Sequence, residues 1–448
     1  MELVYGIKDK PSFGKVFLFS LQQLLAVIAA TIAVPAIVGN GLSASAALFG
    51  AGIGTFIYLL FTKSSSPVFL GSSFAFIGSM FSAFGGAASV AIGTWGLIIG
   101  AIMAGLVYVI IAIIVKYCGI RWIDKLMPPV IIGPTVSIIG LSLSSNAVSD
   151  LMKSSVSGGS TYVALICGLI TLAVTMICST YGKKIGRLIP FIIGILAGYL
   201  CASIFSLIGY TTNNQNLIVI NYSAFLEVTS FFALPKFTFL LGGFEGLKGI
   251  TPTYLLTIFA AYVPVAFVVF AEHLADHKNL SSIVEVDLLK EPGLTRTLLG
   301  DGIGTIFSTF FGGCPSTTYG ESIGCVAITR NASTISIWGC AIMCIVFSLI
   351  SPLVAFLETI PNCVMGGVCI ALYGFISISG FKMFQKVDLN LNKNLFVASV
   401  IFITGVGGMV VKFGKVEIRT VACALILGIL TNILLSGKSA DEEVKKGD

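Results

Sequence analysis

The chain has 448 residues, of which 56% are hydrophobic and only 10% are charged, and its mean hydropathy is +1.01. Too few polar residues are present to cover a soluble globule of this size, so we expect a polytopic membrane protein. The net charge of +6 comes without a basic patch, which argues against a nucleic-acid partner. The 11 cysteines lie mostly in apolar stretches without C-x-x-C pairs, so we predict no disulfide or metal role for them.

A helix needs about 20 apolar residues to cross a bilayer. On that basis the sequence predicts fourteen transmembrane segments, near 15–36, 44–62, 67–80, 91–115, 127–148, 161–181, 186–209, 252–275, 294–312, 316–329, 333–357, 362–380, 393–411 and 417–436. The third and tenth are short and rich in small or polar residues, Gly71-Ser-Ser-Phe-Ala-Phe76 and Ser316-Thr-Thr-Tyr-Gly-Glu321. Each holds the third place in its seven-segment half.

The orientation follows from the basic residues, because short cytoplasmic loops collect Lys and Arg. With both termini inside, most of the 26 lysines and arginines fall on the cytoplasmic side. Two halves of seven segments then have opposite orientation, and such inverted repeats hold substrate near the midplane, where discontinuous helices meet. We expect residues 70–76 and 315–322 to face each other there. The alternative is that each stretch is a polar loop outside the membrane.

Ionisable residues gather between 271 and 330. Glu272 and Asp276 are four residues apart, as are the chain's two histidines, His273 and His277, so a helix would present each pair on one face. By position alone, Glu272 is equally well explained as an interfacial acid beside Lys278. The H-x-x-x-H spacing suits zinc, but no third ligand is evident, so we predict no metal site.

Glu321 follows a polar run within an otherwise apolar segment. If residues 316–320 are extended and Glu321 opens a half-helix, free backbone N–H groups point at the midplane beside its carboxylate. Phe74 on the opposing segment adds a backbone N–H and an aromatic face. Such a site suits a small, flat, neutral ligand with N–H donors and C=O acceptors. Two carboxylates in one buried site repel each other, so we expect one to hold a proton and transport to be proton-coupled.

Several further motifs stand in order along the chain: Ser20-Leu-Gln-Gln-Leu-Leu, Ala271-Glu-His-Leu-Ala-Asp-His, Asp287-Leu-Leu-Lys-Glu-Pro-Gly-Leu, Pro315-Ser-Thr-Thr-Tyr-Gly-Glu-Ser-Ile-Gly324 and Val364-Met-Gly-Gly-Val. With them the chain resembles, end to end, the nucleobase–ascorbate transporter family (nucleobase:cation symporter 2, xanthine/uracil permeases), most closely its bacterial uracil permeases. The resemblance implies an all-α fold of fourteen segments in two inverted seven-segment repeats, with short β-strands in segments 3 and 10. It divides the chain into a core domain (1–126 and 251–360), a gate domain (127–250 and 361–436) and a cytoplasmic tail (437–448).

The same resemblance implies a set of substrate-binding residues: Glu272, Glu321, Phe74, Gly320, Tyr319, Ala30, Tyr373 and Ser73. The two glutamates are expected to accept hydrogen bonds from ring N–H groups of uracil. The backbone N–H groups of Phe74 and Gly320 are expected to bind its carbonyls. Proton coupling is assigned to Glu272, Asp276 and His277.

Three positions depart from the family pattern. The family's Gln-His pair in the first segment is Gln22-Gln23 here, and Asp276 stands where some uracil permeases have a histidine. Ser322 stands where many relatives have asparagine. Because xanthine transporters of the family tend to carry glutamine at the position of Glu321, the glutamate favours uracil.

We therefore expect a secondary active transporter that imports uracil with a proton by alternating access, with no enzymatic activity and no cofactor. The alternatives are a carrier for another nucleobase such as xanthine, an anion carrier of the same fold, a channel, and a membrane enzyme with Glu272, His273 and Asp276 as acid and base. The expected partners are uracil, protons, membrane lipid and a second copy bound through the gate domain. The expected location is the bacterial cytoplasmic membrane, with both termini cytoplasmic and no cleaved signal peptide.

Overall fold

The computed structural model describes residues 3–119, 122, 126–183, 186, 189–385, 387–413 and 416–436. These residues are mostly helical, and they form two compact units. The first unit comprises Met1–Ser73, Leu143–Leu241 and Asp276–Leu372, and the second comprises Phe74–Ser142, Gly242–Ala275 and Tyr373–Asp448. These two units are defined by contacts, whereas the predicted core and gate domains are defined by how they move against each other. The division into core and gate domains therefore stays a prediction. The predicted tail at 437–448 lies outside the described residues.

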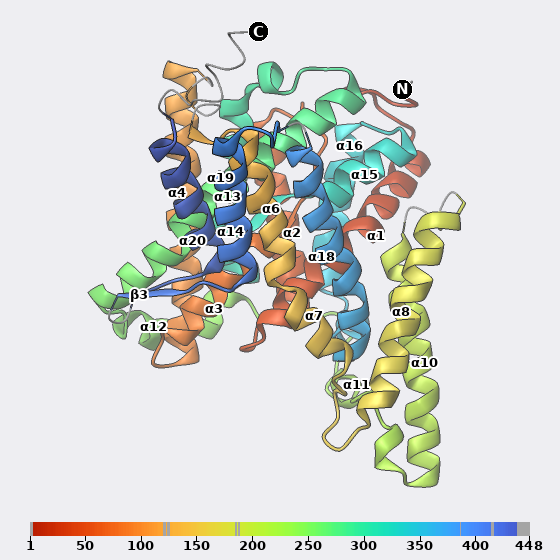
Figure 1. The fold of residues 1–448 in the computed structure, drawn as a ribbon. Helices are drawn as coiled ribbons and strands as arrows, with labels where there is room; N and C mark the ends of the chain where they lie inside the picture. The colour runs from red at the N-terminus through yellow and green to blue at the C-terminus, as the bar shows by residue number, and fades with distance from the viewer. Residues whose placement is uncertain are drawn as a thin grey trace. The chain divides into compact units, whose positions relative to one another are not determined.

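The first unit is built around helix α2, which packs against α1, α14 and α16. Gly50 of α2 allows the close approach to α14, because a Cβ there would collide with the Ser308 carbonyl oxygen. Helices α8 and α10 run side by side (Figure 1). The elements are α1 (Phe13–Val38), α2 (Ala44–Phe61), β1 (Leu70–Ser72), α7 (Ser144–Leu151), α8 (Thr161–Tyr181), α10 (Pro190–Thr212), η2 (Gln215–Leu217), α11 (Ser223–Leu226), η3 (Leu289–Gly293), α14 (Leu294–Gly312), β2 (Ser316–Thr318), α15 (Gly320–Thr329), α16 (Thr334–Ser348) and α17 (Ser351–Glu358).

In the second unit, helix α19 packs against α6 and α20, and α3 packs against α4. Its elements are η1 (Phe74–Phe76), α3 (Ile77–Gly85), α4 (Val90–Cys118), α6 (Pro129–Ser142), α19 (Asn392–Val406), β3 (Val411–Phe413), β4 (Val416–Ile418) and α20 (Thr420–Leu434). Three helices contribute residues to both units: α12 (Thr238–Lys248), α13 (Pro252–Val284) and α18 (Asn362–Phe384).

Among the described residues, eight helices are long and apolar enough to cross a membrane: α1, α2, α4, the α6–α7 stretch, α8, α10, α13 and α18. Every predicted segment overlaps a helix or a strand, but several are shorter or interrupted, so the count of fourteen in two inverted repeats stays a prediction. Helix α13 runs on to Val284 rather than ending at 275. Its acids therefore lie inside a helix, not at its end.

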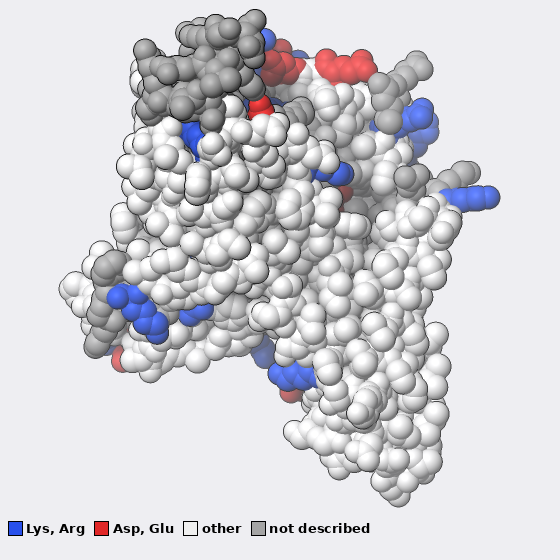
Figure 2. Space-filling model, in the orientation of Figure 1, with Lys and Arg blue, Asp and Glu red and all other residues white. Residues whose placement is uncertain are grey.

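Apolar side chains cover much of the surface. On α4, Leu106, Ile110 and Ile113 are 50%, 55% and 50% exposed, and their spacing places them on one face of the helix. Most of the molecular face drawn in Figure 2 carries no Asp, Glu, Lys or Arg. Such a surface is suited to lipid rather than water, as expected for a polytopic membrane protein.

Candidate functional site

Two three-residue strands form the centre of the candidate site in the first unit. β1 and β2 pair antiparallel, with Leu70 opposite Thr318, Gly71 opposite Thr317 and Ser72 opposite Ser316. The backbone N–H of Ser73 bonds the Pro315 carbonyl at 2.8 Å and continues the ladder. The prediction that the third and tenth segments contain short strands that face each other is confirmed.

Side-chain hydroxyls complete the hydrogen bonding of these strands. Thr55 of α2 donates to the Leu70 carbonyl at 3.2 Å and accepts from the Leu70 N–H at 3.0 Å. Thr305 of α14 donates to the Ser316 carbonyl at 2.6 Å. Extended backbone is tolerated at membrane depth only where its polar groups are satisfied within the protein. Here the two threonines form those hydrogen bonds with the backbone of Leu70 and Ser316.

Tyr319 is held against the first strand. Its hydroxyl donates to the Ser72 carbonyl at 2.8 Å, and its backbone N–H donates to the Phe69 carbonyl at 3.2 Å. A Cβ at Gly71 would collide with the Tyr319 ring, so only glycine leaves room for it. This explains the glycine that opens the Gly71-Ser-Ser motif.

Helix α15 begins at Gly320, immediately after Tyr319. Gly320 is exposed, and no heavy atom lies within 4 Å of where its Cβ would stand. Glu321 is in the first turn of this helix, where backbone N–H groups have no partner within the helix. Helix α15 therefore begins between the second strand and open space on the Cβ side of Gly320, and Glu321 follows in its first turn.

Ser322 ties α15 to two other elements. Its hydroxyl accepts hydrogen bonds from the Phe69 N–H, at 3.0 Å, and from Gln23 Nε2 of α1. Gln23 Nε2 also donates to the Ser322 carbonyl at 3.2 Å. Gln23 and Ser322 are two of the departures from the family pattern, and in this chain they bond each other.

Asp276 and His277 belong to the first unit and lie near this strand pair. Asp276 Oδ2 accepts a hydrogen bond from Thr318 Oγ1 at 2.6 Å, which joins α13 to β2. The ring of His277 is 1% exposed and its Nε2 lies 2.7 Å from the Tyr58 hydroxyl. Glu321 is close enough to act electrostatically on Asp276. Asp276, predicted to couple protons, thus shares its surroundings with Glu321.

Two further predicted residues of the first unit are deeply buried. Ala30 of α1 is 1% exposed. Ser73 is also 1% exposed, and its hydroxyl has no hydrogen-bond partner among the described residues. That hydroxyl is available to a ligand.

The second unit holds Phe74, Tyr373 and Glu272. The Phe74 and Tyr373 rings meet edge to face at 5.7 Å, and both residues are at least nine-tenths buried. Glu272 is partly buried on α13, and the ring of its neighbour His273 meets that of Tyr108 at 6.2 Å. The structure thus divides the predicted residues between the two units, and it shows contacts only for some of them, such as the Phe74 and Tyr373 rings. A single pocket made of residues from both units stays a prediction.

Asp301 and Tyr58 were missed by the sequence analysis. Asp301 lies on α14 and is fully buried, and it acts electrostatically on both Asp276 and Tyr58. The available signal was a lone acid in the middle of the apolar segment 294–312, which the rule for intramembrane acids would have selected. Tyr58 gave no such signal, because a tyrosine in an apolar helix is unremarkable.

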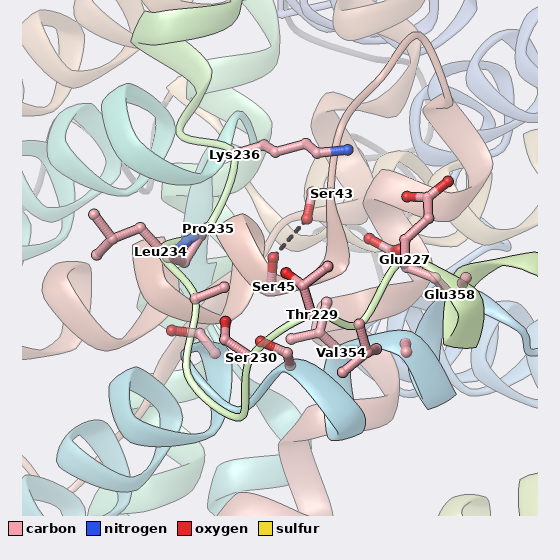
Figure 3. A pocket seen from close by; sticks show the side chains of 16 residues that line it. Ser43, Ser45, Glu227, Thr229, Ser230, Leu234, Pro235, Lys236, Val354 and Glu358 are labelled. Carbon is pink, nitrogen blue, oxygen red and sulfur yellow. Dashed lines mark hydrogen bonds between the residues drawn. The ribbon is translucent and has the colours of Figure 1, made fainter.

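A separate cavity of about 160 Å³ lies in the first unit, lined by the start of α2, the stretch 224–236, the end of α16 and α17. Figure 3 shows Glu227, Glu358 and Lys236 at its walls, with a Ser43–Ser45 hydrogen bond of 2.7 Å. Burial raises the pKa of the Glu358 carboxyl, and the charge of Glu227 raises it further while Lys236 opposes the change. None of the predicted site residues lines this cavity.

Apolar helices around buried strands, with buried acids inside the helices and Glu321 at the start of α15, are typical of a polytopic membrane transporter. The sequence pattern of the Permease family matches residues 14–413, and the chain belongs to this family of transporters.

Named relatives and a solved structure agree with this assignment. The chain is 38% identical to a uracil permease of Bacillus subtilis (strain 168) over 96% of this chain and 94% of that protein. It is 38% identical to a uracil permease of Bacillus caldolyticus over 97% and 95% of the two chains. The transmembrane domain of a cyanobacterium bicarbonate transporter, BicA, has a similar fold, with a TM-score of 0.64 and 17% identity over 95% of this chain and all of that one. That last likeness concerns the fold alone.

Proposed function

We propose that the protein imports uracil by proton symport. The observation that carries this proposal is the similarity to uracil permeases over nearly the full length of both chains. The chemistry at the end of the second strand supports it, because α15 begins at the exposed Gly320, with open space on its Cβ side, and carries the Glu321 carboxylate in its first turn. Uracil offers the complementary carbonyls and ring N–H groups.

In the proposed complex, Glu272 and Glu321 accept hydrogen bonds from the two ring N–H groups of uracil. The backbone N–H groups of Phe74 and Gly320 donate to its carbonyls. The rest of the pocket is formed by Ala30, Ser73, Tyr319 and Tyr373. The fixed position of Tyr319, bonded through its hydroxyl to Ser72, supports its role as a rigid wall.

Proton coupling is proposed to run through Glu272, Asp276 and His277. Moving one charge through about 100 mV supplies about 2.3 kcal/mol. At about 1.4 kcal/mol per tenfold ratio, this sustains about a fifty-fold gradient of a neutral substrate. One proton for each uracil is therefore enough for useful accumulation.

Alternating access is proposed to arise from motion of the core domain against the gate domain, in a frame of fourteen segments with inverted repeats. We further propose cytoplasmic termini and a homodimer formed through the gate domain. The exposed apolar side chains of α4, α8 and α10 support extensive contact with lipid. The substrate is proposed to leave chemically unchanged, since the protein acts as a carrier and not as an enzyme.

The test is uptake of radiolabelled uracil into proteoliposomes with an imposed proton gradient. We expect saturable uptake that excess xanthine leaves unchanged and a protonophore abolishes, with the recovered label still uracil. Competition by xanthine would widen the substrate range to other nucleobases. Uptake that ignores the protonophore would remove proton coupling. Bicarbonate uptake without uracil uptake would replace this proposal with an anion carrier.

A further inference from the structure

Three polar side chains meet in the first unit at a place that the proposed uracil site does not use. The Tyr58 hydroxyl donates to Ser66 Oγ at 2.8 Å and lies 2.7 Å from Nε2 of His277. Ser66 Oγ lies 3.4 Å from the same nitrogen. Tyr58, Ser66 and His277 are each at most 1% exposed. We call these residues the Tyr58 triad.

The triad joins three separate elements. His277 follows Asp276 on α13, Tyr58 lies in the last turns of α2, and Ser66 lies in the loop that connects α2 to β1. In that loop the chain passes from the exposed Lys63 to the fully buried Ser66. The triad therefore extends from the helix that carries the acids to a loop that reaches the protein surface.

Charged and titratable groups face the triad from several elements. Asp276 of α13 and Asp301 of α14 both act electrostatically on the Tyr58 hydroxyl. Asp276 is in turn hydrogen-bonded to Thr318 of β2 and is influenced by Glu321 of α15. The loop contributes Lys63, whose side chain points to the exterior of the unit as an exposed residue. The triad thus links Asp276's neighbour His277 to the loop that contains Ser66.

We propose that the Tyr58 triad carries protons between the acid cluster around Asp276 and the surface loop at residues 62–66. Tyr58 and Ser66 act as positioning residues, because they orient His277 and connect it without touching the substrate. This inference rests on the proposed function, since a proton path has a purpose only if transport is proton-coupled.

The proton balance of the path is simple. In the starting state, His277 has taken a proton from the acid cluster at Nδ1 and is an imidazolium, its Nε2–H donates to the Tyr58 oxygen, and the Tyr58 hydroxyl donates to Ser66 Oγ. When Ser66 releases its own proton toward the loop, Tyr58 passes its proton to Ser66, and His277 passes the Nε2 proton to Tyr58. One proton then leaves at the loop and His277 is left as a neutral imidazole, which returns to its first tautomer before Nδ1 accepts the next proton from the acid cluster. Each hydroxyl ends with as many protons as it began with.

The first variant to test is Tyr58→Phe, which removes one oxygen and keeps the ring. The matched control is Tyr254→Phe, because the Tyr254 hydroxyl bonds two backbone carbonyls, Ala83 at 2.6 Å and Ile92 at 3.4 Å, and no titratable side chain among the described residues. Two measurements are made in proteoliposomes: exchange of labelled for unlabelled uracil, which moves no net proton, and proton-driven accumulation with a pH-sensitive dye inside.

We expect Tyr58→Phe to lower accumulation and proton influx by at least about tenfold, because a positioned proton-transfer group contributes about 10²–10⁴-fold in enzymes. Exchange should stay within about twofold of the wild type, since binding is intact. Tyr254→Phe should leave both rates unchanged. Equal losses in exchange and accumulation would show a structural role and overturn the proposal, as would unchanged accumulation. Failure of wild-type exchange, by contrast, would overturn the proposed function itself.

A second variant keeps the test decisive if Tyr58→Phe does not fold. Ser66→Ala should also lower proton influx more than exchange, and Ser66→Thr, which retains a hydroxyl, should restore it. Ser65→Ala is the control from the same loop, because that hydroxyl bonds only the Lys63 carbonyl, at 3.3 Å, among the described contacts. Equal proton influx in Ser66→Ala and Ser65→Ala would also overturn the proposal.

Discussion

The structure contains two short antiparallel strand pairs that differ in almost every other respect. β1 and β2 join residues 70–72 to 316–318, and every residue of both strands is buried. β3 and β4 join residues 411–413 to 416–418, close neighbours in the chain, and Lys412 is exposed. The first pair is bonded by threonine hydroxyls from α2 and α14, whereas Lys412 of the second pair is exposed. Two strand pairs of equal length thus lie at the proposed binding site in one case and at an exposed position in the other.

The largest expected effect comes from the two glutamates of the proposed site. Glu321→Gln and, on α13, Glu272→Gln should each abolish uracil accumulation, a loss of at least about a hundredfold, because the acceptor for a ring N–H becomes a partial donor. Both proteins should remain folded and inserted in the membrane. Uptake into proteoliposomes checks this, with the exposed Glu245→Gln as control. Wild-type uptake in either variant would remove that glutamate from the site.

The next effect tests the tight fit between Gly71 and Tyr319. Gly71→Val should displace the Tyr319 ring and lower uracil uptake by about ten- to a hundredfold, because overpacking costs about 1–3 kcal/mol. Lys412→Val, in the exposed hairpin, should change uptake little. Equal effects at both positions would mean that burial does not distinguish the two strand pairs.

A smaller effect is expected where the site depends on backbone rather than on a side chain. Phe74→Ala should weaken uracil binding by about tenfold or less, since the proposed main contact is its backbone N–H and the lost interaction is an edge-to-face ring contact. Equilibrium binding of labelled uracil measures this. Loss of the folded protein instead would identify Phe74 as a packing residue.

The smallest effect concerns the hydroxyl that braces β2. Thr305→Val leaves the Ser316 carbonyl without this donor and should destabilise the protein by about 1–3 kcal/mol, lowering the thermal midpoint by several degrees. The control is Thr431→Val on α20, because that hydroxyl bonds only a carbonyl of its own helix, at 2.8 Å. Thermal unfolding in detergent gives the comparison. Equal shifts would contradict a special role for Thr305.

The sequence predicted two facing, interrupted segments because their residues are unusual for their location, and the family resemblance predicted that they contain short strands. Gly71-Ser-Ser and Ser316-Thr-Thr are small, polar and placed inside apolar stretches, which a continuous membrane helix would not contain. Asp301 was equally visible as an intramembrane acid but was read only as part of an apolar segment. The pairing of β3 with β4 was not predicted, since these strands lie at the adjoining ends of two assigned segments.

Other features depend on tertiary contacts that no local pattern reveals. The bond between Tyr58 and His277 joins residues on two helices far apart in the chain, and neither residue type demands the other. Some helix boundaries fall where apolar composition continues or changes gradually. These are the breaks at Leu143 and near Ile350, and the ends of helices α11 and α12. Periodicity and span length cannot resolve such positions.

The two hydrogen bonds between the Thr55 hydroxyl and the backbone of Leu70 have a consequence for the synthesis of the protein. During synthesis, β1 enters the membrane long before residues 316–318 have been translated, so its future partner does not yet exist. Thr55, only fifteen residues earlier, already offers a donor and an acceptor to Leu70. The threonine can therefore satisfy the backbone N–H and carbonyl of Leu70 before β2 has been made, so that neither group is left without a hydrogen bond in lipid.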